Sequence, residues 1–191
     1  FFANNVRIAT TAALEELGLD PQYAGWQLST KYNSGGARVM GAEFNFRHTL
    51  RPLGAWGRFF TVFANATKLE LSGSRQADFS GFIPQNLNWG VTFTRKPVTL
   101  IAKWNYRGEQ KLAALPAFGP DAFNYTKERL TLDLSADYQI NKRLSLNSNI
   151  RNLFNEYLTT VRHGSSTPVY AQPRQYRHFG VYFSAGIKGT F

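Results

Sequence analysis

The sequence lacks cysteine altogether, and its only methionine is Met40. Without cysteine the chain can form no disulfide bond and no cysteine-based metal site. This absence suits an exported protein but does not identify a compartment. The chain begins Phe1-Phe2-Ala3, with no initiator methionine and no basic and apolar signal segment, so we expect it to be the remainder of a longer or processed chain.

Long hydrophobic runs are also missing. No run of about 18 consecutive apolar residues occurs, which excludes a helical membrane span. A transmembrane strand needs only about 9–11 residues, of which half stay polar. A mean hydropathy of −0.33 is therefore compatible with a barrel, and a composition of 43% apolar and 18% charged residues fits a globular protein equally well.

Acidic residues are scarce: 12 Asp and Glu stand against 22 Lys and Arg, a net charge of +10. The excess suggests an anionic partner such as nucleic acid, phosphate-rich lipid headgroups or an anionic ligand. Nucleic-acid-binding proteins usually gather their basic residues on one face or in one tract. Here the basic residues are spread among strand-like segments: Arg38, Arg58, Arg95, Lys103, Arg107, Lys127, Arg151 and Lys188. We expect no nucleic-acid partner.

The histidines give no sign of a metal or cofactor site. His48, His163 and His178 lack metal-ligand spacing, so we expect surface or interface residues. His163 lies near Ser165 and Ser166, but no acid and no nucleophile-elbow motif surrounds them. His163 also follows Arg162, and in an external loop it could touch an anionic ligand.

Two carboxylates on one strand do not form a catalytic pair either. Asp133 and Asp137 are about 13 Å apart along an extended strand, too far for a glycosidase pair on that strand. We expect them to pair with basic residues of adjacent strands, such as Lys103 or Arg151. The sequence predicts no catalytic, cofactor-binding or metal-binding residue, and no enzyme.

Alternation of apolar and polar residues dominates the chain. Every second residue of the last segment is apolar or small: Phe179, Val181, Phe183, Ala185, Ile187, Gly189 and Phe191. Such a pattern predicts a strand with one apolar face. Similar patterns occur in residues 58–71, 87–93, 98–106, 130–140 and 144–151. Residues 26–46 keep one parity, which favours one long strand with a flexible middle at residues 33–36, although a separate two-residue hairpin gives the same phase. We therefore predict about seven antiparallel strands.

Short and long connections alternate between these strands. Short turns lie at residues 51–54, 96–97 and 141–143, whereas long loops span residues 72–85, 110–124 and 155–175. We expect a short helix at residues 11–18. All eight prolines should lie between strands: Pro21, Pro52, Pro84, Pro97, Pro116, Pro120, Pro168 and Pro173.

Alternating loop lengths are typical of a transmembrane barrel, whose short turns lie at the periplasmic rim. Phe191 then lies on the periplasmic side. Aromatic side chains could form girdles at the membrane interfaces, namely Trp26, Trp89, Trp104, Tyr138 and Phe191. The alternative, core aromatics of a soluble β protein, stays open.

One segment carries a family resemblance. Arg151-Asn152-Leu153-Phe154-Asn155, followed by Glu156-Tyr157-Leu158, resembles the penultimate-strand motif of TonB-dependent outer-membrane receptors. The ending from Gly186 to Phe191 is similar to theirs. Further pieces occur in the family's order: residues 41–44, 83–84, 105–108 and 132–134.

The resemblance implies a barrel of about 22 strands with an N-terminal plug and a segment that contacts TonB. All 191 residues would form the C-terminal part of that barrel, and neither plug nor TonB-contacting segment is recognisable in them. The last strand also resembles the signal read by the barrel-assembly machinery, with Ser184, Gly186 and Phe191 in place and Gly189 as a departure.

The resemblance further implies an outer-membrane receptor for TonB-energised uptake of a scarce ligand such as a ferric siderophore, cobalamin or a carbohydrate. Its partners would be outer-membrane lipid and lipopolysaccharide, the TonB complex, the barrel-assembly machinery and a small-molecule ligand. Ligand contacts are expected in the three long loops, with no individual residue identified. A passive porin and a soluble β-sandwich binding module remain as alternatives.

Overall fold

The computed structural model describes residues 2–33, 36–73, 81–115, 118–119 and 121–189. The chain forms two compact units, one of Phe1–Val39 with Leu71–Asp78 and the other of Met40–Glu70 with Phe79–Phe191. Each unit is considered by itself below.

The first unit is a hairpin with a small helical tip. Strands β1 (Phe2–Ile8) and β2 (Gln27–Asn33) pair antiparallel, with Ile8 opposite Gln27. Between them lie helix α1 (Thr11–Glu16) and the 3₁₀ turn η1 (Pro21–Tyr23). The Thr10 hydroxyl caps α1 by accepting from the Ala13 N–H at 3.3 Å. Gly18, at φ +66°, follows the end of the helix. The predicted helix is thus confirmed.

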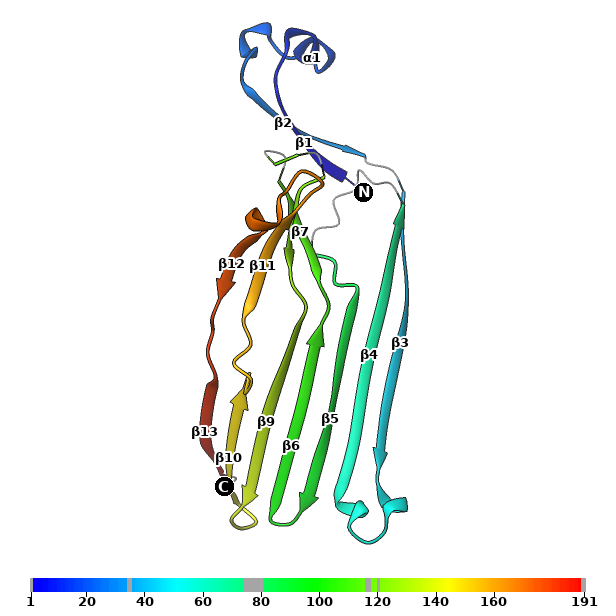
Figure 1. Ribbon diagram of the computed structural model, residues 1–191, viewed down its shortest axis with the longest axis vertical. Coiled ribbons are helices and arrows are strands. Elements are labelled where there is room, and N and C mark those ends of the chain that lie inside the picture. The colour runs from blue at the N-terminus through cyan, green and yellow to red at the C-terminus, as the bar shows by residue number, and fades with distance from the viewer. Residues whose placement is uncertain (1, 34–35, 74–80, 116–117, 120, 190–191) are drawn as a thin grey trace. The chain divides into compact units, whose positions relative to one another are not determined.

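The second unit contains a seven-stranded antiparallel sheet, as the alternation predicts (Figure 1). Its order is β13-β10-β9-β6-β5-β4-β3. The strands are β3 (Ala37–Thr49), β4 (Phe60–Gly73), β5 (Gln85–Arg95), β6 (Val98–Arg107), β9 (Arg129–Gln139), β10 (Leu144–Arg151) and β13 (Tyr182–Gly189). Chain neighbours pair except where β6 joins β9 and β10 joins β13, because other elements intervene there.

The register gives the sheet one apolar and one polar face. Cross-strand partners bring apolar or small residues to the same side in one row: Phe93, Leu100, Ala136, Ser148 and Ala185. The next row on the opposite side is polar in part, with Thr92, Ile101, Ser135, Asn149 and Ser184. Alternation with period two places the whole apolar set on one surface.

The apolar face is uncovered in the described part of this unit. Ile187 is 70% exposed and Phe183 63% exposed, although both lie inside strand β13. The sheet forms a single layer in Figure 1, with no second sheet packed against it. Water would penalise an apolar surface of this extent, so the face is built to meet lipid or another apolar surface. Within the described residues, this sheet is therefore not one layer of a sandwich.

Two strand predictions need correction. The long strand expected from Trp26 to Phe46 is two strands, because β2 pairs with β1 while β3 pairs with β4. The final strand begins at Tyr182 instead of Phe179, since Gly180 has a left-handed φ of +76° that interrupts the extended chain. Residues 34–35 and 190–191 lie outside the described part.

The short connections are confirmed, and they lie together at one end of the strands, called the short-turn edge below (Figure 1). Between β9 and β10, the Asn141 Oδ1 atom accepts from the N–H groups of Arg143 at 2.8 Å and Leu144 at 3.0 Å. Between β3 and β4, the turns η2 (Arg51–Leu53) and η3 (Gly57–Phe59) make the connection. The Asn141 side chain thus forms an Asx turn, which keeps the β9–β10 hairpin short.

Two of the long connections contain strands that the sequence analysis missed. They form a four-stranded sheet in the order β12-β11-β8-β7, made of β7 (Gln110–Ala114), β8 (Phe123–Thr126), β11 (Leu158–His163) and β12 (Pro173–Arg177). The 3₁₀ turn η5 (Val169–Ala171) precedes β12. Pro173 therefore begins a strand, where a missing N–H is tolerated, instead of lying between strands. In the described residues, no helix is long and apolar enough to cross a membrane.

Candidate functional site

The motif at residues 151–155 forms a tight turn after strand β10. Arg151 ends the strand, and Asn152 and Asn155 follow with left-handed φ values of 56° and 57°. Asparagine tolerates this region better than other residues with a Cβ. The Asn155 N–H donates to the Asn152 carbonyl oxygen at 2.8 Å, which closes the turn. The two asparagines of the motif are therefore explained by backbone geometry.

The Asn152 side chain ties three segments together. It is 7% exposed. Its Nδ2 donates to the Gly180 carbonyl at 3.1 Å and to the Glu156 carbonyl at 3.2 Å, and its Oδ1 accepts from the Glu156 N–H at 3.0 Å. Glu156 lies just before β11 and Gly180 just before β13. The Asn152 amide therefore fixes where the chain leaves the seven-stranded sheet after β10 and where it returns to that sheet before β13.

A carboxylate on the neighbouring strand extends this network. Asp133 accepts from the Asn152 N–H at 2.9 Å and from Asn105 Nδ2 at 3.0 Å. The expected ion pairs of Asp133 and Asp137 with Lys103 or Arg151 are absent among the described residues, although Lys103 stands directly opposite Asp133. Amide and backbone donors already satisfy Asp133, so its predicted basic partners were wrong.

Leu153 and Phe154 of the motif have a different role. Both are exposed, at 38% and 54%. The Leu153 N–H donates to the Leu132 carbonyl oxygen at 2.8 Å, which anchors the turn to β9. Sequence reasoning found the motif but missed Asp133 as the acceptor of the Asn152 N–H, because nothing in the local sequence indicates which side chains adjacent strands bring together.

The assembly-signal residues lie in the last strand. Ser184 stands opposite Asn149, and Gly186 stands opposite Asn147. A Cβ at Gly186 would lie 3.1 Å from Asn147 Oδ1, so glycine leaves room for that amide. Phe191 lies outside the described residues. Their role in assembly stays a prediction.

The four-stranded sheet of β7, β8, β11 and β12, called the loop sheet below, is built from two long connections. A polar contact joins these two connections. Asp121 Oδ2 accepts from the Ser165 N–H at 2.7 Å, and hydrogen bonding to Ser165 lowers the pKa of this exposed carboxyl. Strand β8 pairs with β11, with Phe123 opposite His163. An acid thus lies beside Ser165, yet it binds the backbone N–H, and no hydrogen bond joins His163 to either residue in the described set. This contact joins the two long connections.

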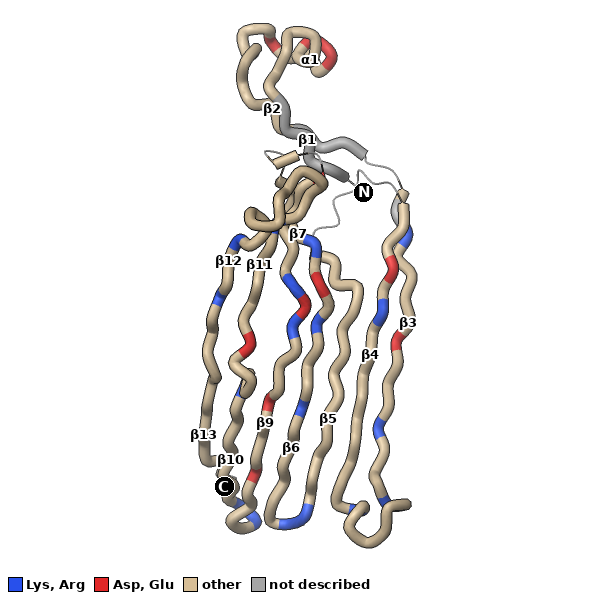
Figure 2. Tube along the Cα trace, viewed as in Figure 1, with Lys and Arg blue, Asp and Glu red and all other residues tan. Residues whose placement is uncertain are grey.

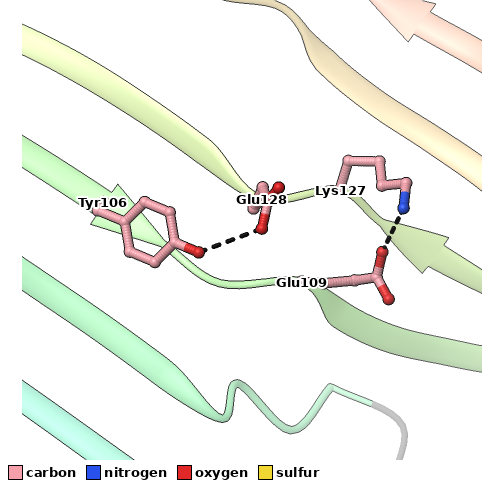
Figure 3. A network of polar contacts seen from close by, with 4 residues as sticks. All are labelled: Tyr106, Glu109, Lys127 and Glu128. Carbon is pink, nitrogen blue, oxygen red and sulfur yellow. Dashed lines mark hydrogen bonds and ion pairs between the residues drawn. The ribbon is translucent and has the colours of Figure 1, made fainter.

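Two further polar contacts flank the start of the loop sheet (Figure 3). Lys127 Nζ lies 2.7 Å from Glu109 Oε2, and the Tyr106 hydroxyl donates to Glu128 Oε2 at 3.2 Å. The hydrogen bond with Glu109 raises the pKa of Lys127. Both carboxylates near this rim are therefore already engaged.

The short-turn edge carries aromatic rings with cations above them. Trp56 and Phe59 pack edge to face at a centroid distance of 6.3 Å, and the Arg95 guanidinium lies 5.6 Å and 5.4 Å from their respective centroids. Figure 2 shows basic residues along this edge. Trp89 and Trp104 stack within the sheet at 6.4 Å. Trp26 instead lies in the first unit, beside Tyr23.

The described residues contain no group of three or more His, Asp or Glu side chains placed to hold a metal ion. The ring neighbours of the histidines are aromatic: Phe46 for His48, Tyr125 for His163 and Tyr157 for His178.

Comparison with known proteins gives one family and one fold. The sequence pattern of the family "TonB dependent receptor-like, beta-barrel" matches residues 5–153. No curated protein sequence matches significantly. Among solved structures, the copper transporter OprC is similar with a TM-score of 0.62 and 17% identity, over 86% of this chain and 25% of that one. This chain thus corresponds to about a quarter of the length of that protein. Because the sequence identity is low, the similarity shows a shared fold and nothing more.

Proposed function

This chain belongs to the TonB-dependent receptor-like β-barrel family, and from that premise we propose that it forms part of the wall of an outer-membrane receptor that takes up a scarce small ligand with energy supplied through TonB. Ferric siderophores, cobalamin and carbohydrates are the ligand classes to test first. The TonB complex would be contacted through a part of the receptor that this chain does not contain.

The uncovered apolar face of the seven-stranded sheet is the observation that carries the proposal. Its strands are 8 to 14 residues long, comparable to the roughly 9–11 residues that cross a bilayer when tilted. The opposite face is polar through residues such as Asn88, Asn105 and Asp133. One lipid-compatible and one water-compatible face are what a barrel with a polar interior requires.

The alternation of short and long connections supports an orientation for the proposed receptor. Short turns belong at the periplasmic rim and long loops outside the cell. Strand β13 ends with Gly189 opposite Leu144, at the short-turn edge. The C-terminus would then lie on the periplasmic side, and the four-stranded loop sheet would lie outside, where ligand arrives. In this arrangement the chain acts in binding and transport, not in catalysis.

Uptake by the full-length receptor tests the proposal. The receptor gene is expressed in a Gram-negative host with and without a functional TonB, and accumulation of labelled ferric siderophores, cobalamin and oligosaccharides is measured. We expect accumulation of one ligand class that disappears without TonB. Equal accumulation in both hosts would favour a passive porin, and recovery of the receptor in the soluble fraction without detergent would favour a binding module.

A further inference from the structure

Two arginines face each other across adjacent strands at the loop end of the sheet. Arg107 ends β6, Arg129 begins β9, and they are direct register partners. Directly opposed residues project from the same face, and like charges in this arrangement repel. By contrast, the pair four residues further along each strand on the same face, Lys103 and Asp133, combines opposite charges. The unbalanced row therefore requires an explanation.

The arginines line a hollow of about 300 Å³ on the polar side of the rim. Lys127 lines it too, together with the polar side chains of Asn86, Asn105 and Thr131. No carboxylate is among the lining residues. The hollow thus offers cationic and neutral donors. Lys127 is paired with Glu109, but no lining carboxylate neutralises Arg107 or Arg129.

Nearby carboxylates are engaged elsewhere. Glu109 pairs with Lys127, Glu128 accepts from the Tyr106 hydroxyl, and Asp133 accepts from Asn105 and Asn152 (Figure 3). In the described residues, neither Arg107 nor Arg129 has an acidic side chain within ion-pair distance of 4.0 Å. Arg107 is held by a hydrogen bond to the Gln110 side chain, and Gln110 in turn donates to the Gly81 carbonyl at 2.6 Å.

The geometry points to an oxyanion-binding site formed by Arg107 and Arg129, which receives a carboxylate or phosphate group of the incoming ligand. A guanidinium presents a planar set of donors that matches such groups, and one anion between two guanidiniums removes their mutual repulsion. This inference rests on the proposed transport function for identifying the occupant as a transported ligand. The anion site itself can be tested without transport.

Thermal unfolding of the full-length receptor in detergent is the test, with inorganic phosphate as the probe. The midpoint of unfolding is compared in sodium phosphate and in sodium chloride of equal ionic strength, so general screening cancels. We expect phosphate to raise the midpoint of the wild type, and calorimetry to give phosphate binding that is roughly tenfold or more weaker in the double variant Arg107→Gln, Arg129→Gln.

Lys103→Gln is the matched control, because Lys103 lies on the same strand and face but opposite a carboxylate. It should keep the phosphate response. The double variant should fold at least as well as the wild type in chloride, since it loses a repulsive pair. Equal midpoints of the wild type in the two salts, a response that survives in the double variant, or a response lost equally in the control would each overturn the site. Loss of TonB-dependent uptake with phosphate binding intact would overturn only the transport function.

Discussion

Replacing Asn152 by alanine should destabilise the wall more than any other single change in the motif at residues 151–155. The substitution removes three hydrogen bonds made by a side chain that is 7% exposed. It leaves the Gly180 and Glu156 carbonyl oxygens and the Glu156 N–H without that partner. A buried polar group without a partner costs about 1–3 kcal/mol.

The backbone adds to this cost. Asn152 has φ 56°, a left-handed conformation that costs alanine roughly 1–2 kcal/mol. Water will bind some of the backbone groups that lose the Asn152 side chain as a partner. We therefore expect the free energy of unfolding to fall by about 3–5 kcal/mol in total. Asn152→Gly separates the two contributions, because glycine accepts the backbone conformation and lacks the side chain. It should lose about 1 kcal/mol less than alanine.

Urea unfolding of the purified full-length receptor, followed by the electrophoretic shift between folded and unfolded barrel, measures the difference. Asn149→Ala is the control, since Asn149 lies in β10 three residues before Asn152 and its side chain makes no hydrogen bond within the described residues. It should change the unfolding free energy by less than about 1 kcal/mol. If Asn152→Ala unfolds at the same urea concentration as Asn149→Ala, the amide does not hold the segments together and the reasoning fails.

Gly90→Val should destabilise the barrel by about 1–3 kcal/mol in the same urea assay, because a Cβ there would lie 2.3 Å from the Ala102 carbonyl oxygen; an unchanged midpoint would mean that the strands separate freely. The lowered pKa of Asp121 means that its bond to the Ser165 N–H is present above the unfolded pKa and lost as pH falls through the folded one. Hydrogen exchange at Ser165, corrected for intrinsic rates, should therefore speed up only at acidic pH, and Asp121→Asn should abolish that dependence. Deleting Phe191 in the full receptor should lower its level in the outer-membrane fraction, and an unchanged level would remove it from the assembly signal.

Much of the seven-stranded sheet could be predicted from the sequence, because alternation of apolar and polar residues shows which side of a strand meets apolar surroundings. Residues 144–151 keep Leu144, Leu146 and Ile150 on one side, interrupted only by Ser148, and form β10 with those bounds. The pattern failed where pairing depends on a distant partner. Residues 26–46 keep one parity throughout, yet β2 and β3 pair with different strands.

The loop strands were missed for a related reason. Strand β8 has only four residues, Phe123–Thr126, too few to establish alternation, and it exists because β11 and β7 pair with it. Asp133 shows the same limit at the site. Its charge suggested a basic partner, whereas the register placed an amide and a backbone N–H in reach first.

The pairing of β8 with β11 has a mechanical consequence. These strands come from different loops, and four register pairs from Thr160 with Thr126 to His163 with Phe123 join them. Because backbone hydrogen bonds join β8 to β11, the bases of the two loops can separate only if those bonds break. Inserting or deleting one residue inside β8 would reverse which of its side chains face outward unless β11 changed to match. The two loops are therefore free to diversify at their tips but bound to evolve together at their joined bases.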